Sequence, residues 1–176
     1  MMDRAAGAPE IARAQTLSGT SLMLSHAALH KIKLHAMRTY PEECCGVLFG
    51  DADGSSKKVC DVLEIRNAKE ENRGRRFLIT AAEYRWAEER AAKKGVSLLG
   101  FYHSHPDHPA EPSQFDLDHA MPWCSYLIAA VRDGNPAAVR SWILREDRSA
   151  FDEEILEITD GELLRPCGEG RGDDHH

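Results

Sequence analysis

Two histidines stand two residues apart, at His103 and His105, directly after a run of apolar residues. Because side chains on a strand alternate between its faces, a strand over residues 98–105 would project both imidazoles to one side, with Leu99 and Phe101 behind them. Two neutral imidazoles side by side suit zinc or a similar first-row ion. A bare pair of this kind is common by chance, so the interpretation depends on the residues that come after it in the chain.

The segment after the histidines offers a third ligand, Asp116. Three prolines make the intervening chain turn: Pro106, Pro109 and Pro112. Two imidazoles and one carboxylate leave a fourth tetrahedral position open for water, as in catalytic rather than structural zinc sites. Ser113 and Asp116 also have the spacing of a capping box, and a helix starting there would fix where Asp116 points. The pattern therefore predicts a metallohydrolase.

The whole pattern, H-S-H-P followed after six residues by S-x-x-D, resembles that of the JAMM (MPN+) metalloprotease family, and the resemblance covers roughly residues 22–145. Family members also carry a glutamate three residues before the first glycine of an upstream strand. That element corresponds here to the sequence PEECCGVLFG at residues 41–50, and the glutamate corresponds to Glu43. The adjacent Glu42 is the competing candidate.

The resemblance implies a role for each signature residue. His103, His105 and Asp116 would hold one Zn²⁺ per chain. Glu43 would act as the general base, and Ser113 would help to stabilise the oxyanion. Because every signature position is present, the resemblance implies an active peptidase rather than an inactive scaffolding relative.

The resemblance also implies an α/β (α+β) fold, in which a curved mixed β-sheet is flanked by helices in a JAMM/MPN-like, cytidine-deaminase-like sandwich. A mixture of strands with a few helices favours the same class. We expect a flexible leader over residues 1–20, one JAMM/MPN+ metalloprotease domain over residues 21–159, and an acidic flexible tail over residues 160–176.

Periodicity and capping signals predict the elements of this domain. Three helices are expected, over residues 25–40, 80–94 and 113–121. Seven strands are expected, over residues 45–49, 59–66, 76–79, 98–105, 125–132, 139–144 and 151–158, the last at a sheet edge.

For the substrate, the chain resembles small bacterial stand-alone members that act on ubiquitin-like sulfur-carrier proteins. This implies hydrolysis of the peptide or isopeptide bond after a C-terminal Gly-Gly, in sulfur transfer or cysteine biosynthesis. One alternative is a deconjugating isopeptidase for a bacterial ubiquitin-like modifier. Another is a non-catalytic MPN-type interaction module.

Composition limits the remaining classes of function. The chain has 176 residues and a net charge of −7, all of which is contributed by residues 145–176. No basic stripe favours nucleic acid, and no apolar run approaches the ~20 residues of a membrane helix. The N-terminus lacks the pattern of a signal peptide, so we expect a cytoplasmic protein with no membrane partner.

Cysteine usage offers a different chemistry. In a reducing cytosol we expect all five cysteines to be free thiols: Cys44, Cys45, Cys60, Cys124 and Cys167. A cysteine nucleophile with His103 as its base is therefore a second interpretation, although the metal site explains more residues at once.

Overall fold

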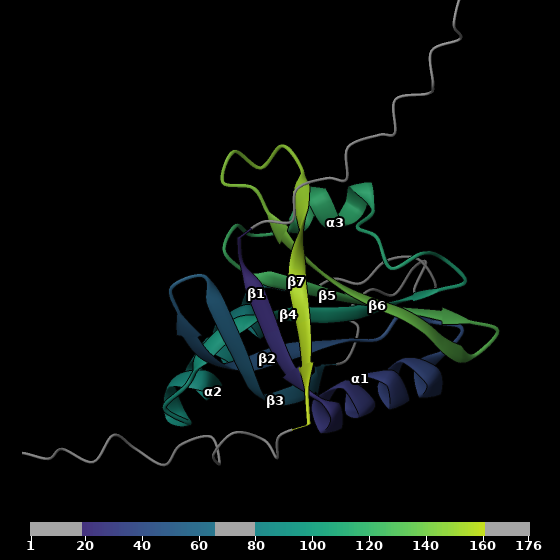
Figure 1. The fold of residues 1–176 in the computed structure, drawn as a ribbon, viewed down its shortest axis with the longest axis horizontal. Coiled ribbons are helices and arrows are strands. Elements are labelled where there is room, and N and C mark those ends of the chain that lie inside the picture. The colour runs from purple at the N-terminus through teal and green to yellow at the C-terminus, as the bar shows by residue number, and fades with distance from the viewer. Residues whose placement is uncertain (1–18, 66–79, 161–176) are drawn as a thin grey trace, which may run out of the picture.

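The computed structural model describes residues 19–65 and 80–160 (Figure 1). The described strands are β1 (Ser21–Ser25), β2 (Cys45–Asp53), β3 (Ser56–Ile65), β4 (Ser97–Pro106), β5 (Ser125–Arg132), β6 (Asn135–Leu144) and β7 (Phe151–Thr159). The described helices are α1 (His26–Thr39), α2 (Ala81–Lys93) and α3 (Gln114–His119). The strand expected over residues 76–79, and all but the inner ends of the expected leader and tail, lie outside the described residues.

The strands form one mixed sheet that closes on itself in the order β1-β3-β2-β4-β5-β6-β7. The expected curved mixed sheet flanked by helices is thereby confirmed. The edge position expected for the last strand is wrong, because β7 pairs antiparallel with β6 and parallel with β1. Strand β1 was not expected. Its five residues run directly into a helix, so they are too few for an alternating pattern to stand out.

The helices begin where the capping signals predict. The Ser25 side chain accepts a hydrogen bond from the Ala28 amide at 3.1 Å and starts α1. Thr80 and Glu83 form a capping box at the start of α2. These bonds satisfy amides that the first turn of a helix leaves without partners, which explains why the boundaries could be read from the sequence.

Two apolar clusters lie on opposite faces of the central strands. The first contains buried residues of α1, such as Ile32, together with Tyr102 of β4 and Leu127 of β5. The second contains Ala87 of α2, Phe101 of β4 and other residues near α3. Strand β4 therefore contributes side chains to both clusters, Tyr102 to the one beside α1 and Phe101 to the one beside α2. The ribbon in Figure 1 labels these three elements.

Strand β4 pairs antiparallel with β2 and parallel with β5. Leu99 and Phe101 were expected together behind the histidines, but Phe101 lies in the α2-side cluster and Leu99 in the α1-side cluster, so the expected shared face is wrong. The pairing with β2 shifts register beside this point, so alternation is interrupted between Leu99 and Phe101. The intervening Gly100 lies against the Ser125 backbone, where a Cβ atom would collide with a carbonyl oxygen.

Glycine at position 46 makes room for Tyr102, a residue that is 1% exposed. The ring lies over Gly46, and its hydroxyl is 2.9 Å from Nδ1 of the buried His35 on α1. A Cβ at position 46 would collide with the Tyr102 ring. Because this ring is buried and its hydroxyl is bonded to His35, it cannot easily move aside.

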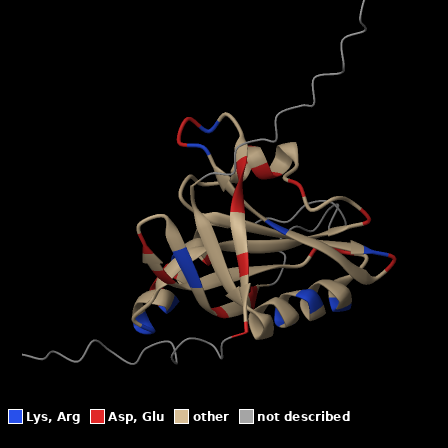
Figure 2. Ribbon diagram, viewed as in Figure 1, with Lys and Arg blue, Asp and Glu red and all other residues tan. Residues whose placement is uncertain are grey.

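Charged side chains of both signs are spread over the described surface, with basic residues along α1 and acidic residues along β7 (Figure 2). Two acidic residues of β7 have arginine partners: Arg145 pairs with Asp152, and Arg140 pairs with Glu153. Part of the acidic C-terminal segment thus belongs to the sheet. Within the described ranges, no helix is long and apolar enough to cross a lipid bilayer.

Replacing Gly46 by alanine should lower the free energy of unfolding by about 1–3 kcal/mol, because the new methyl group overpacks against Tyr102. Urea denaturation would measure this. The same substitution at Gly19, where a Cβ meets nothing within 4 Å, serves as the control and should change stability by less than about 0.5 kcal/mol. Equal effects at the two positions would contradict the packing assigned to Tyr102.

Candidate metal centre

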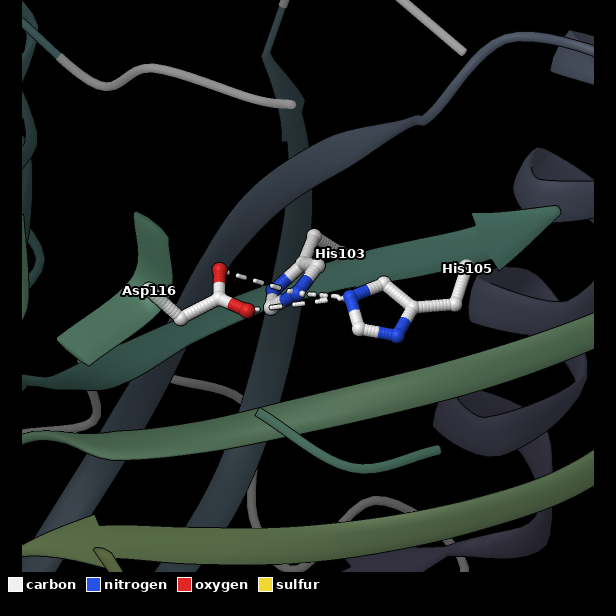
Figure 3. A group of neighbouring side chains, drawn as sticks. All are labelled: His103, His105 and Asp116. Atoms are coloured by element: carbon white, nitrogen blue, oxygen red, sulfur yellow. Dashed lines mark hydrogen bonds and ion pairs between the residues drawn. The ribbon is translucent and has the colours of Figure 1, made fainter. Parts of the chain in front are cut away.

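The structure brings the three expected ligands together at one point (Figure 3). The Nε2 atoms of His103 and His105, on β4, lie 3.1 Å apart. Asp116, on α3, places one carboxylate oxygen 3.4 Å from Nε2 of His103 and the other 3.7 Å from Nε2 of His105. All three side chains are buried, although they come from a strand and from the helix after it in the chain.

These separations fit a tetrahedral zinc ion. Bonds of about 2.0–2.1 Å at tetrahedral angles place neighbouring ligand atoms roughly 3.3–3.5 Å apart. The 3.1 Å between the two Nε2 atoms and the 3.4 Å from His103 to one Asp116 oxygen lie close to that range, and the 3.7 Å from His105 is measured to the other oxygen of the same carboxylate. Two imidazole nitrogens and a carboxylate also form a donor set that zinc accepts. The residues therefore fit the metal that the sequence pattern predicts, and its presence remains a prediction.

A carbonyl group orients His105 toward the cluster. Nδ1 of His105 lies 2.8 Å from the carbonyl oxygen of Pro109, so this nitrogen carries the hydrogen and donates it. The neutral ring then has its lone pair on Nε2, the atom that faces Asp116. Second partners of this kind fix the tautomer of metal-binding histidines. The proline-rich loop thus supplies orientation as well as a turn.

Two side chains of β6 hold that loop in place. The indole Nε1 of Trp142 donates to the carbonyl of Ala110 at 2.9 Å. The guanidinium of Arg140 pairs with Glu111 at 2.8 Å and stacks over the Trp142 ring at 4.5 Å. Because consecutive loop residues are anchored, the Pro109 carbonyl has a fixed position beside His105.

Helix α3 begins at the capping box that the sequence predicts, and this box sets the direction of Asp116. The Ser113 hydroxyl accepts from the Asp116 amide at 3.2 Å and donates to the Asp116 carboxylate at 2.7 Å. The Ser113 amide donates to the same oxygen at 2.6 Å. In this structure Ser113 therefore positions Asp116, while its expected contact with a substrate oxyanion remains a prediction.

The structure separates the two adjacent glutamates. Glu43 is 4% exposed and lines the same cleft as His105 and Ser113, whereas Glu42 is exposed. Ser104, which lies between the two histidines, anchors the backbone next to Glu43. Its Oγ accepts from the Cys44 amide at 2.9 Å, and its own amide donates to the Cys44 carbonyl at 3.1 Å.

Burial governs the ionisation of the cluster. Loss of water raises the pKa of Glu43 to about 8; His105 lowers it in part, and Asp116 adds to the rise. Burial would also raise the pKa of Asp116, but His103, His105 and Ser113 hold it well below its usual range. Burial lowers the pKa of His103 and so favours the neutral imidazole that a metal requires.

The cleft beside the cluster has a volume of about 380 Å³. Its lining residues come from the segment before β2, the end of β4 and the proline-rich loop: Glu43, His105, His108, Pro109, Glu111, Pro112 and Ser113. A carboxyl group, an imidazole edge and a serine hydroxyl thus face one open space. The cluster offers ligands for a metal ion, and the Glu43 carboxyl in the adjoining cleft offers a group that can accept or donate a proton.

The cysteine-nucleophile interpretation finds little support in the described residues. Cys44, Cys45 and Cys124 are buried free thiols. Burial raises the pKa of Cys44 to about 11 and that of Cys45 and Cys124 to about 12, so all three are protonated at neutral pH. Cys60 is disulfide-bonded, which makes the expectation of five free thiols wrong, because spacing along the chain does not tell which cysteines meet.

A model of the prokaryotic homologs of the JAB domain matches residues 25–145. The chain belongs to this family. It is similar to desampylase from Haloferax volcanii, with 34% identity over 113 residues, which cover 58% of this chain and 70% of that protein. The resemblance to the JAMM/MPN family is therefore confirmed.

Two solved structures share the JAB fold. The solution structure of a Desulfitobacterium hafniense protein has a TM-score of 0.70 at 30% identity and covers 80% of this chain and 94% of its own. A JAB1/MPN domain protein from Archaeoglobus fulgidus has a TM-score of 0.51 at 18% identity, and the match covers 80% of this chain and 100% of that protein. At this identity the likeness shows a shared fold and nothing more.

Sequence analysis missed the supporting residues of this JAB domain. Ser104 is part of the H-S-H-P motif, and its place there could have indicated a structural role, which the structure shows as a hydrogen bond from the Cys44 amide. Trp142 and Arg140 lie about thirty residues beyond the loop that they hold, and nothing in the local pattern connects them with it. Sheet pairing of β5 with β6 brings them there.

His105→Ala should reduce bound zinc from about one equivalent to well below half, because one of three protein ligands is lost. Elemental analysis of purified protein would measure the metal. His108→Ala is the matched control, since His108 lines the same cleft but lies outside the cluster, and it should keep full zinc. Undiminished zinc in His105→Ala would refute the ligand assignment.

Proposed function

We propose that this JAB domain is a zinc-dependent peptidase that hydrolyses the bond after the C-terminal Gly-Gly of a ubiquitin-like protein. The observation that carries the proposal is the buried Glu43 carboxyl, which lines the same cleft as His105, one member of the three-residue cluster. A non-catalytic interaction module would have no use for a general base held at this point.

The residues divide the chemistry between them. A zinc ion held by His103, His105 and Asp116 would supply a Lewis acid and lower the pKa of water toward 7. Glu43 would take a proton from the attacking water as its oxygen adds to the scissile carbonyl carbon. It would then give that proton to the amine as the carbon–nitrogen bond breaks, leaving a carboxylate and a free amine.

The environment of Glu43 suits this exchange of protons. Burial favours its protonated form, whereas a cation bound at the cluster would favour the carboxylate. The two influences oppose each other, which keeps both forms accessible near neutral pH. Ser113 would contribute to the oxyanion only if its hydroxyl hydrogen turned away from Asp116, to which it donates in this structure.

The similarity to a desampylase supports the removal of a modifier from a conjugate, that is, isopeptidase activity. Processing of a sulfur-carrier protein extended beyond Gly-Gly, in sulfur transfer or cysteine biosynthesis, is the second candidate, and it is motivated by the sequence resemblance. Both reactions break an amide bond after the same tail, and the same residues would carry them out.

Glu43→Gln should keep bound zinc but lower kcat by at least 100-fold, because the amide cannot accept the proton. Glu42→Gln is the adjacent, exposed control and should remain near wild type. Mass spectrometry of two substrates would follow the reaction: a ubiquitin-like protein with a linear extension after Gly-Gly, and a lysine-linked conjugate of it.

Cleavage of the linear substrate alone would favour carrier processing, and cleavage of the conjugate alone would favour deconjugation. Full activity in Glu43→Gln would remove this residue from the chemistry. Failure of the zinc-loaded wild-type protein to cleave either substrate would refute the proposed function.

A further inference from the structure

A second cavity, of about 340 Å³, lies next to the cleft at the start of α3. Its lining residues come from the first turns of α2, from β4 and β5, and from α3 with the residues after it. Figure 1 labels these helices and strands. We call it the α2–α3 cavity. Asp116 lines it, while Ser113, the hydrogen-bond partner of Asp116, lines the cleft. The two hollows therefore meet at the metal-facing turn of α3.

The walls of the α2–α3 cavity are mostly apolar and well fixed. Phe101 packs against Tyr84 of α2 at 6.0 Å and against Tyr126 of β5 at 6.1 Å between ring centroids. The Tyr126 hydroxyl accepts from the Met121 amide at 2.7 Å, which ties the segment after α3 to the sheet. Phe115 of α3 adds a further apolar wall. A preformed apolar hollow of this size is typical of a site that receives a ligand group.

The position along β4 relates this cavity to the bond to be cleaved. Phe101 precedes His103 by two residues on the same face of the strand, so the two lie about 7 Å apart. An extended peptide advances by about 3.3 Å per residue. A side chain two residues away from the reacting carbonyl would therefore reach the cavity.

Glu43 indicates which side of the substrate points this way. In the proposed mechanism it gives its proton to the departing amine, and it lines the cleft rather than the α2–α3 cavity. The leaving group thus occupies the cleft, and the acyl side of the substrate extends toward Phe101.

We propose that the α2–α3 cavity is a specificity site for a large apolar side chain, such as leucine or phenylalanine, on the residue immediately before the Gly-Gly. This inference rests on the proposed function, since it takes the scissile carbonyl to lie at the cluster. The two glycines lie beside Asp116, between the cleft and the α2–α3 cavity, and the side chain before them anchors the tail.

The test observes binding as well as cleavage. Full-length, zinc-loaded protein with ¹³C-labelled methionine methyl groups is titrated with acetyl-Leu-Gly-Gly and, separately, with acetyl-Asp-Gly-Gly. Met121 lines the cavity, whereas Met23 on β1 and Met37 on α1 do not and serve as internal references. The leucine peptide should shift the Met121 signal and bind at least tenfold more tightly than the aspartate peptide, which corresponds to about 1.4 kcal/mol.

Two substitutions on α2 form a matched pair. Ala81 is exposed and lines the cavity, whereas its exposed neighbour Ala82 does not. Ala81→Trp should fill the cavity, abolish the Met121 shift, and raise KM at least tenfold for substrates with leucine before Gly-Gly. Ala82→Trp should behave as wild type in both measurements.

A Met121 shift that is equal for both peptides, or equal behaviour of the two tryptophan variants, would overturn the proposal. Cleavage of Gly-Gly substrates without any preference at the preceding residue would refute the specificity site and leave the proposed function standing. Selective leucine-peptide binding without cleavage of any substrate would refute the proposed function while supporting the apolar site.

Discussion

A pair of hydrogen bonds between Cys44 and Ser104 links the two halves of the site. Ser104 stands between His103 and His105, and Cys44 comes directly after Glu43. This contact lies at the point where β2 and β4 pair, so the register of these strands decides whether Glu43 and His105 line the same cleft. A one-residue slip would turn every side chain of β2 to the other face. The chemistry of the site therefore depends on sheet pairing.

Burial affects the two carboxyl groups of the site differently, because they have different partners. Removing water from a carboxylate is costly unless partners compensate for the loss. Asp116 has such partners in the imidazoles and in Ser113, and it remains ionised. Glu43 has weaker compensation, and its pKa rises to about 8. Two carboxyl groups in one small volume thus have pKa values shifted in opposite directions, which suits the proposed roles of an anionic ligand and of a group that exchanges a proton.

Local patterns predicted the parts of this fold whose causes are local. The capping boxes at Thr80 and Ser113 and the alternation of His103 and His105 could all be predicted because each depends on neighbours within a few residues. The closure of the sheet by β1 and the disulfide at Cys60 could not, since both depend on distant pairing. For the same reason, the resemblance indicated Glu43, while its burial beside the cluster required the structure.

The central claim is that His103, His105 and Asp116 bind zinc while Glu43 stays outside the coordination shell. X-ray absorption at the zinc edge tests this most directly on zinc-loaded protein. We predict nitrogen and oxygen neighbours at about 2.0–2.2 Å, with the scattering signature of two imidazoles and the same spectrum in Glu43→Gln. A sulfur neighbour at about 2.3 Å, a third imidazole, or a spectrum altered by Glu43→Gln would contradict the account.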